Sequence, residues 1–288
     1  MKILLTGHSG YFSNEFLKSC IKKKKLKIFC LTRKNKINKK NIFFFKVDLS
    51  KNKIKNLDII KEVDYIIHCA FMKMNTKISK TRLIQNNINI TNNLIKIIKN
   101  IKFKKLINFS TISLYPYKNG TFSEKAKINF SKNPDYPYAY SKYFAEKQFN
   151  KKIDKKKLLH LRIANIIFNK NDMGILWNMK RSIKNNNKII IYGNGRRILN
   201  LVHVNKLILY IFKVLKFKNL YGEYNLSDYS INLKDIAKII KKKYGNSMTK
   251  IIYSNIINSN PKSIINANFF FKKLNINKPK ITKLFYEI

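Results

Sequence analysis

A tyrosine and a lysine lie four residues apart in the segment Tyr138-Ala-Tyr-Ser-Lys142. On a helix, this spacing places both side chains on one face. The lysine cation would favour the phenolate and lower the pKa of the phenol from about 10, so that the tyrosine could act as a general acid or base at neutral pH. The spacing alone carries no information. Lysine is frequent enough that several such pairs are expected by chance, and Tyr143 and Lys147 form a second one.

A glycine-rich loop follows the first apolar run, in the order Thr6-Gly7-His8-Ser9-Gly10-Tyr11-Phe12-Ser13. A helical pattern starts directly after it, and a strand, a tight turn and a helix N-terminus are the context in which such a loop holds a phosphate. Gly7 would permit the turn, Gly10 would let the backbone approach a pyrophosphate, and the helix start at Tyr11 and Phe12 would supply N–H groups. A serine stands where a third glycine is usual. The loop predicts a dinucleotide site.

The second apolar run ends in Cys30-Leu31-Thr32-Arg33. A site that prefers NAD would place an acidic residue there to accept hydrogen bonds from the adenosine ribose. A hydroxyl at Thr32 and a guanidinium at Arg33 suit a ribose 2′-phosphate instead. The cofactor is therefore predicted to be NADP or NAD, with NADP favoured.

The elements that position these residues follow from an alternation of apolar runs and helical patterns. Between the runs, the segment Asn87–Lys99 places Ile88, Thr91, Leu94, Ile95 and Ile98 on one predicted helix face. Six alternations predict an α/β fold with a doubly wound parallel sheet covered on both faces. Residues 1–167 are predicted to form a dinucleotide-binding domain and residues 168–288 mainly a substrate-binding region, with elements returning to the first domain. The predicted strands are Ile3–Leu5, Ile28–Leu31, Ile42–Phe45, Tyr65–Ile67, Leu106–Phe109 and Leu158–Leu161.

The formal net charge of +47 could mark a protein that binds nucleic acid or an anionic surface. However, only six of the 61 basic residues are arginine, whose rigid fork suits phosphate better than lysine does. The lysines are also scattered along the chain. Together with abundant Ile and Asn, they indicate AT-rich codon usage rather than selection for phosphate contacts. Nucleic-acid binding is therefore the second hypothesis.

The cysteines indicate the cellular compartment, and the histidines indicate whether a metal site is expected. Three cysteines without a close pair fit a reducing compartment, so the cytoplasm is the expected location. The chain starts directly with a predicted core strand, and no apolar stretch approaches the length of a membrane span. The four histidines lack the spacing of a helical metal site, so no metal is predicted.

The surroundings of Tyr138 and Lys142 resemble the extended short-chain dehydrogenase/reductase family, the nucleotide-sugar epimerases, dehydratases and reductases. That family shows a strand ending in Ser-Ser/Thr-x-x-Val-Tyr, then Tyr-Gly/Ala-x-Ser-Lys, after an N-terminal Thr-Gly-x-x-Gly-x-x-Gly. Here Phe109-Ser110-Thr111-Ile112-Ser113-Leu114-Tyr115 precedes Tyr138 at that distance. Nearly the whole chain follows the family's order, through Asp48-Leu49, His68-Cys69-Ala70, Asn87-Ile-Asn-Ile-Thr91-Asn-Asn-Leu94, Leu161-Arg162-Ile-Ala-Asn165, and Gly193-Asn-Gly195 before Val202-His203-Val204.

The resemblance implies a Rossmann-type fold and a catalytic set of three residues. Tyr138 would exchange a proton with the reacting hydroxyl or carbonyl, and Thr111 would position the substrate oxygen. Lys142 would hydrogen-bond the nicotinamide ribose and lower the pKa of Tyr138. The implied binding residues are Asp48 and Leu49 at the adenine, Cys69 and Ala70 beside the nicotinamide ribose, Asn87 in support, and Asn165, Arg196 and Arg197 at the substrate.

Two departures from the family bear on the reaction. Family dehydratases carry Asp-Glu after the strand-end threonine, and Ile112 and Ser113 stand here instead, which argues against elimination. An arginine clamps the diphosphate in nucleotide-sugar enzymes, and Leu199 occupies that place. Either Arg196 and Arg197 take over the clamp, or the substrate is not a nucleoside diphosphate sugar.

The prediction is an NAD(P)-dependent epimerase or ketoreductase acting on a sugar or nucleotide sugar, with these two reactions left open. The resemblance also leaves open a homodimer through the helices that hold Asn87 and Tyr138. The alternatives are a dinucleotide-binding fold repurposed for RNA binding or regulation, and a degenerate enzyme.

Overall fold

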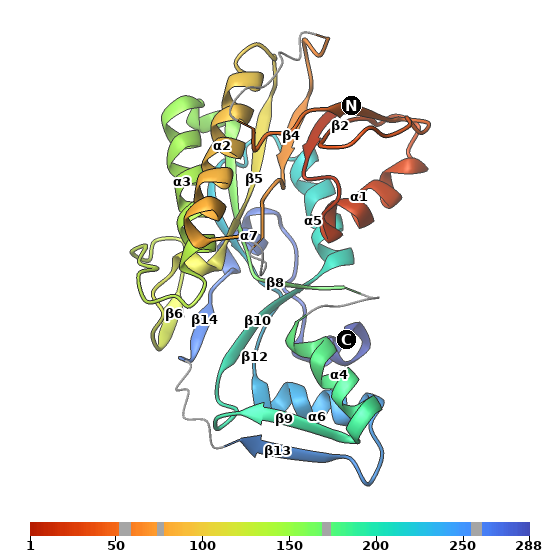
Figure 1. The fold of residues 1–288 in the computed structure, drawn as a ribbon, viewed down its shortest axis with the longest axis vertical. Helices are drawn as coiled ribbons and strands as arrows, with labels where there is room; N and C mark the ends of the chain where they lie inside the picture. Colours follow the sequence, from red (N-terminus) through yellow and green to blue (C-terminus); the bar gives the residue numbers. More distant parts are fainter. Residues whose placement is uncertain (52–58, 74–77, 169–173, 255–260) are drawn as a thin grey trace. The chain divides into compact units, whose positions relative to one another are not determined.

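Seven strands form the central sheet of the computed structural model, which describes residues 1–51, 59–73, 78–168, 174–254 and 261–288 (Figure 1). Their order across the sheet is β11-β7-β5-β4-β1-β2-β3. Every neighbouring pair from β3 to β5 is parallel, which confirms the predicted α/β fold with a Rossmann-type sheet. The bounds are β1 Lys2–Thr6, β2 Lys27–Thr32, β3 Ile42–Lys46, β4 Tyr65–His68, β5 Lys105–Thr111, β7 Leu158–Ile163 and β11 Gly222–Leu226.

Six of these strands coincide with the predicted apolar runs, whereas β11 was not predicted. The segment of β11 reads GEYNL, so it lacks the continuous apolar run by which a buried parallel strand is recognised. It lies at the edge of the sheet beside β7.

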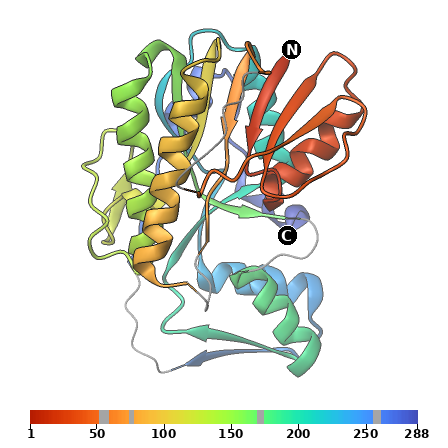
Figure 2. The ribbon, with the colours of Figure 1, turned by 45° about the horizontal axis from the view of Figure 1, so that its top comes forward.

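Two helices cover each face of this sheet. Alternate strand side chains point to opposite faces, and Leu4, Ile66 and Leu106 share one apolar cluster with α2 and α3. The other face is covered by α1 and α5 (Figure 2). There Phe12 of α1 packs against Phe109 of β5, and Phe16 of α1 packs against Phe212 of α5. The bounds are α1 Tyr11–Ile21, α2 Lys80–Ile98, α3 Tyr136–Lys152 and α5 Val204–Lys216.

The buried face of α2 overlaps the predicted one and is wider. Thr91, Leu94 and Ile98 of the predicted face are buried, whereas Ile88 and Ile95 are only half-buried. The buried residues outside the predicted face include Leu83, Asn87, Ile90 and Ile97. The helix packs against α3 as well as against the sheet. A helix that packs on both a sheet and a second helix buries a wider face than a helix that packs on the sheet alone. The apolar pattern of the sequence does not show how many partners the helix has.

Chain contacts divide the molecule into two units. Unit 1 comprises Met1–Pro116, Ile128–Arg162 and Ile208–Tyr224, and unit 2 comprises Tyr117–Lys127, Ile163–Leu207 and Asn225–Ile288. Unit 1 contains most of the central parallel sheet and most of α5. Helix α5 belongs to unit 1 although it lies in the second half of the chain. Two short 3-10 helices, η1 at Ile112–Leu114 and η2 at Lys155–Lys157, also lie in unit 1.

Unit 2 is built from small sheets and helices around its own apolar core. A three-stranded sheet has the order β12-β10-β8, and two parallel pairs join β13 to β9 and β14 to β6. None of the described helices in either unit combines the length and apolarity needed to cross a membrane. The bounds are β6 Gly120–Phe122, β8 Asn165–Ile167, α4 Ile175–Asn186, β9 Lys188–Tyr192, β10 Ile198–His203, β12 Tyr229–Asn232, α6 Leu233–Tyr244, β13 Lys250–Ser254, β14 Ser263–Ile265, α7 Asn268–Lys273, η3 Ile281–Lys283 and α8 Leu284–Glu287.

Candidate active site

The turn after β1 lies against the turn after β4. Gly7 has φ +75°, a left-handed conformation that L side chains rarely adopt. A Cβ atom at Gly7 would lie 2.5 Å from the backbone nitrogen of Ala70 and 2.6 Å from the carbonyl carbon of Cys69. The Ala70 N–H also donates to Thr6 Oγ1 at 3.2 Å. The fold therefore brings the predicted residues Gly7, Cys69 and Ala70 together, and the close approach requires glycine.

The N-terminus of α1 directly follows the glycine-rich loop. Its N-cap is Gly10, and no side chain among the described residues caps it. Tyr11 is largely exposed, whereas the Phe12 ring packs on Phe109 with ring centroids 4.6 Å apart. Phe12 could therefore contact a cofactor only through its backbone N–H. A glycine cradle followed by an uncapped helix N-terminus fits a dinucleotide pyrophosphate.

The end of β2 carries positive charge, but the Thr32 hydroxyl is already occupied. Thr32 Oγ1 donates to the carbonyl oxygen of Lys34 at 3.1 Å and accepts from its N–H at 3.3 Å. Arg33 is exposed. Burial lowers the pKa of His8 in the glycine-rich loop, and the nearby charges of Lys36 and Arg33 lower it further. The His8 Nε2 atom is buried without a hydrogen-bond partner in the described part of the chain. The positive charges of Arg33 and Lys36 therefore lie near the glycine-rich loop. The Thr32 hydroxyl is instead bonded to the backbone of Lys34.

Two buried asparagines of α2 hold the loops that follow β3 and β4. Asn93 Nδ2 donates to the carbonyl oxygens of Leu49 and Lys51 at 2.9 and 2.6 Å. Asn87 Oδ1 accepts from the Met72 N–H at 2.8 Å, and its Nδ2 donates to the Met72 carbonyl at 3.1 Å. Asn87 and Asn93 thus position the segments that carry the predicted cofactor residues Asp48, Leu49, Cys69 and Ala70.

Replacing Asn87 by alanine is expected to lower the free energy of unfolding by about 1–3 kcal/mol, because both Met72 backbone groups lose their partner. The matched control is Asn86→Ala. Asn86 Nδ2 donates only to the Met72 thioether sulfur, at 3.2 Å, which is a weak acceptor. Urea denaturation of the two variants checks the difference. Equal losses would show that Asn87 does not hold the loop.

A cavity of about 630 Å³ opens beside Asp48 and α2, but it is not the predicted reaction site. Neither Thr111, Tyr138 nor Lys142 is among its described lining residues. These are Asp48, Ser50, Lys51, Met72, Ser79, Thr81, Arg82, Gln85, Asn86 and Asn89.

Thr111, Tyr138 and Lys142 meet where β5 ends and α3 begins. Thr111 is the last residue of β5, and its Oγ1 accepts from the Ser113 N–H at 3.1 Å. The Tyr138 hydroxyl lies beside the Thr111 side chain, which acts to lower the pKa of the phenol. One turn along α3, the buried Lys142 Nζ donates to the carbonyl oxygen of Phe109 at 2.7 Å. The structure therefore brings the three residues together in unit 1.

The pKa values differ from the simple expectation that Lys142 lowers that of Tyr138. Burial raises the pKa of Tyr138, a hydrogen bond from Thr111 opposes this, and Asp135 raises it further. Burial lowers the pKa of Lys142 to about 8. Lys142 is absent from the groups that shift Tyr138 because its ammonium is directed at the Phe109 carbonyl. The lowering of the Tyr138 pKa by Lys142 therefore stays a prediction, which requires the ammonium to turn toward the phenol.

Two residues at this place were missed by sequence reasoning. The Phe71 ring lies edge-on to Tyr138, with centroids 4.8 Å apart, and its centroid is 4.8 Å from Lys142 Nζ. Asp135 precedes α3 and raises the pKa of Tyr138. Phe71 directly follows the recognised segment His68-Cys69-Ala70. Its position next to this motif is the sequence feature from which its place near the site could have been predicted.

The predicted substrate residues other than Thr111 belong to unit 2. Asn165 is exposed, and its Nδ2 donates to the Asn200 carbonyl at 3.1 Å. Arg196 and Arg197 are exposed in the turn before β10. Leu199 pairs with Ile231 across β10 and β12 and is part of the apolar core, so it is a packing residue.

The family pattern has two acidic residues after its His-Val pair, and Asn205 and Lys206 stand at those places in this chain. Lys206 Nζ forms an ion pair with Glu287 Oε1 at 2.5 Å and donates to the Tyr229 hydroxyl at 2.8 Å. Lys206 therefore anchors the C-terminal segment of unit 2 rather than replacing an acid at a reaction site.

Comparison with known proteins gives one curated relative and many similar folds. The chain is 25% identical over 265 residues to the dTDP-D-glucose 4,6-dehydratase of Dictyostelium discoideum, covering 83% of this chain and 61% of that protein's own length. The UDP-glucuronic acid 4-epimerase of Bacillus cereus, in complex with UDP-glucuronic acid and NAD, matches with a TM-score of 0.77 and 21% identity over 100% of this chain and 97% of that one. The UDP-N-acetylglucosamine 4-epimerase of Methanobrevibacter ruminantium M1, in complex with UDP-N-acetylmuramic acid, matches with a TM-score of 0.80 and 20% identity over 99% and 95%.

The family match covers most of the sequence. Residues 3–227 match the sequence model of the NAD dependent epimerase/dehydratase family. This match spans all of the central sheet except its first residue, together with the glycine-rich loop and the Tyr138–Lys142 segment. The family match does not support the alternative hypothesis that the chain is a nucleic-acid-binding protein. The chain belongs to the NAD-dependent epimerase/dehydratase family.

Proposed function

We propose that this chain is a nucleotide-sugar epimerase or ketoreductase, in which hydride passes between a nicotinamide and a sugar carbinol or ketone. The observation that carries the proposal is that Tyr138 lies beside the Thr111 side chain, with Lys142 one turn further along α3. The named relatives include two epimerases that act on UDP-sugars. The sugar is assigned to this chain only as part of the proposal.

Tyr138 moves the proton in the proposed reaction. When a sugar hydroxyl is oxidised, the Tyr138 oxygen takes its proton, and on reduction of the ketone it returns one. Thr111 hydrogen-bonds the same oxygen and orients it. The Lys142 ammonium has three N–H donors, and the Phe109 carbonyl takes one of them, which leaves donors for the phenol and for a ribose hydroxyl. Lys142 then favours the phenolate by its charge.

The dinucleotide, when bound, supplies the acceptor or donor of hydride. The residues that would hold it are the backbone of Gly7, Gly10, Tyr11 and Phe12 at the pyrophosphate, with Cys69, Ala70 and Lys142 at the nicotinamide ribose. Asp48 and Leu49 would hold the adenine, and Asn87 and Asn93 fix the loops that carry these residues.

We also propose that the reaction is not a dehydration, although one relative is a dehydratase. Removal of water from a sugar needs an acid to protonate the departing hydroxyl and a base to take a carbon-bound proton. The residues after Thr111 are Ile112 and Ser113, which form η1 and supply neither group. Formation of a 4-keto-6-deoxy sugar from a nucleotide sugar would contradict this proposal.

Arg196, Arg197 and Asn165 are proposed to bind the substrate, with the two arginines serving as the diphosphate clamp. Leu199 is in the core and does not contribute. Exposed guanidinium groups can bind a diphosphate bidentately, which supports this assignment.

The first experiment is a fluorescence titration with NADPH and with NADH, repeated with excess RNA present. Saturable dinucleotide binding that RNA does not affect supports the proposal. Tight, salt-sensitive RNA binding without dinucleotide binding would overturn it. Incubation with UDP-sugars and analysis of the products then separates epimerisation from net reduction.

Tighter binding of NADPH than of NADH is expected, because Arg33 and Lys36 lie beside His8 at the end of β2. Replacing Arg33 by alanine should weaken NADPH binding by about tenfold or more, the cost of a charged hydrogen bond, and leave NADH binding unchanged. Lys24→Ala removes the same charge before β2, at the opposite end of that strand, and is the control. Equal effects of Arg33→Ala on both dinucleotides would contradict the NADP preference.

A further inference from the structure

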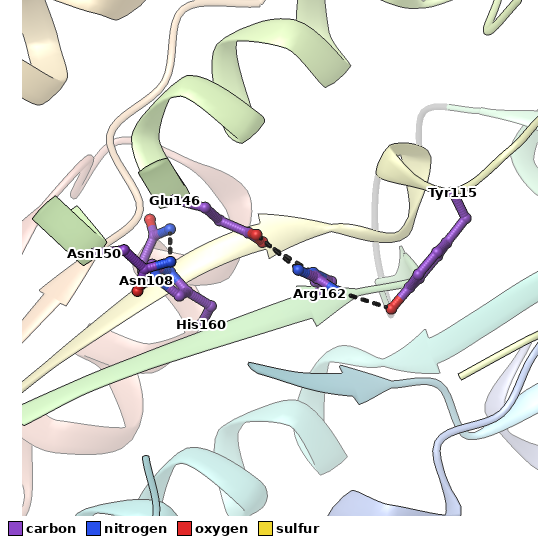
Figure 3. Close-up of polar contacts among 6 residues, drawn as sticks. All are labelled: Asn108, Tyr115, Glu146, Asn150, His160 and Arg162. Carbon is purple, nitrogen blue, oxygen red and sulfur yellow. Dashed lines mark hydrogen bonds and ion pairs between the residues drawn. The ribbon is translucent and has the colours of Figure 1, made fainter. Parts of the chain in front are cut away.

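A buried ion pair joins α3 to β7 behind the catalytic residues. Arg162 Nε donates to Glu146 Oε1 at 3.1 Å, and its Nη2 donates to Glu146 Oε2 at 2.8 Å (Figure 3). The two side chains are only 7% and 4% exposed. Arg162 Nη1 donates further to the Tyr115 hydroxyl at 3.1 Å. Glu146, Arg162 and Tyr115 are not among the residues proposed to bind the cofactor or the substrate.

This network links the elements that carry the catalytic set. Glu146 lies one turn after Lys142 on α3, so both occupy one face of the helix. Tyr115 ends the η1 turn that starts directly after Thr111, and its N–H donates to the Ile112 carbonyl. Arg162 comes from β7, the neighbour of β5 in the sheet. One guanidinium therefore ties the end of β5 to the helix of Tyr138 and Lys142.

Glu146 is also the anion that faces Lys142. Burial lowers the pKa of Lys142 to about 8, while Cys69 and Glu146 raise it and Lys73 lowers it. Burial raises the pKa of the Cys69 thiol to about 12, so Cys69 is neutral below that pH. Burial lowers the pKa of His68 to about 3, so His68 is neutral as well. Burial acts to raise the pKa of Glu146, but the hydrogen bonds and charge of Arg162 hold it below its usual value. At neutral pH, Glu146 is therefore the negative charge among these groups.

Stability alone is a weak reason for such a pair. Replacing both partners of a buried ion pair by apolar residues of similar volume is often neutral or stabilising, whereas removing one partner is costly. Stability therefore does not by itself explain this ion pair. Its carboxylate also acts on Lys142, whose pKa it raises.

We propose that Glu146, Arg162 and Tyr115 are positioning residues for catalysis, which hold Thr111 against Tyr138 and keep Lys142 cationic through the charge of Glu146. This inference rests on the proposed function. The three residues touch neither substrate nor cofactor and act through Lys142 and Thr111.

The test is the double variant Glu146→Leu/Arg162→Met, which leaves no unpaired charge. It should fold and bind dinucleotide at pH 7. Its kcat should fall by about 10- to 100-fold, the usual cost of losing groups that orient a functional side chain. The alkaline limbs of kcat and of dinucleotide affinity should both move to lower pH, because Lys142 loses the carboxylate that keeps it charged. Tyr115→Phe, which removes a single hydroxyl, should lower kcat without moving either limb.

The matched control replaces a buried neutral pair that also has one member on β7. Asn108 of β5 and His160 of β7 are hydrogen-bonded, with Nδ2 and Nδ1 3.0 Å apart (Figure 3). Asn108→Leu/His160→Met should leave both alkaline limbs in place. If Glu146→Leu/Arg162→Met keeps the kcat and the limbs of the wild type, the inference is overturned. If the wild type itself turns over no nucleotide sugar, the proposed function fails, and the pH dependence of dinucleotide affinity still tests the role of Glu146.

Discussion

Replacing Tyr138 by phenylalanine is expected to lower kcat by about 10²–10⁴-fold, the usual contribution of a general acid or base. The substitution removes one hydroxyl, which lies beside the Thr111 side chain. The ring and its edge-on contact with Phe71 remain. Dinucleotide affinity and the free energy of unfolding should therefore stay close to those of the wild type. Steady-state kinetics with a UDP-sugar, together with a dinucleotide titration, measure both quantities.

The chain offers a close control in Tyr143→Phe. Tyr143 also has a lysine four residues later on α3, and Lys147 Nζ lies 5.3 Å from the centroid of its ring. The residues near Tyr143 are Phe130 and Lys147 rather than Thr111 and Phe71. Its loss should leave kcat unchanged. A fall in kcat of the same size in both variants would show that Tyr138 has no special role.

Replacing Gly7 by alanine is expected to lower the free energy of unfolding by on the order of 3 kcal/mol or more. The new Cβ would lie 2.5 Å from the Ala70 nitrogen and 2.7 Å from its Cα, and both are backbone atoms that no side-chain rotation can move. The left-handed φ adds strain. Dinucleotide binding should be lost, because the turns after β1 and β4 are forced apart. Urea denaturation and a fluorescence titration check the two effects.

Gly10→Ala separates the needs of the fold from those of the ligand. Gly10 has φ −69°, and a Cβ there would lie 3.3 Å from the Gly7 carbonyl oxygen, a contact that a small shift relieves. The free energy of unfolding should change by less than about 1 kcal/mol. Dinucleotide affinity should fall by at least about tenfold, because the methyl group occupies the space the pyrophosphate approaches. Unchanged affinity in Gly10→Ala would contradict a phosphate site at this loop.

Most of the central sheet could be predicted from the sequence, because a buried parallel strand leaves a continuous apolar run. The run Leu106–Phe109 became β5, a strand whose seven residues are all buried. The edge strand β11 has no such run, and only its pairing with β7 identifies it. The same limit applies to α2, whose buried face depends on α3 as much as on the sheet.

The predicted site shows a similar division. Gly7, Cys69, Ala70, Thr111, Tyr138 and Lys142 were named from motifs, and the fold brings them to the carboxyl ends of β1, β4 and β5. Phe71 and the partners of Arg162 were not named, since their roles arise from contacts between elements far apart in the chain. The direction of Lys142 toward the Phe109 carbonyl was equally unreadable, because a flexible side chain is directed by its surroundings.

The sequence by itself determined the fold class, the glycine-rich loop and the residue types at the proposed reaction centre. Each depends on local order along the chain, in the period of apolar residues or the spacing of a motif. Only the tertiary structure decided which cations face His8, which carboxylate faces Lys142 and how far burial shifts their pKa values. Those quantities depend on distances and desolvation, which exist only once the strands and helices have packed.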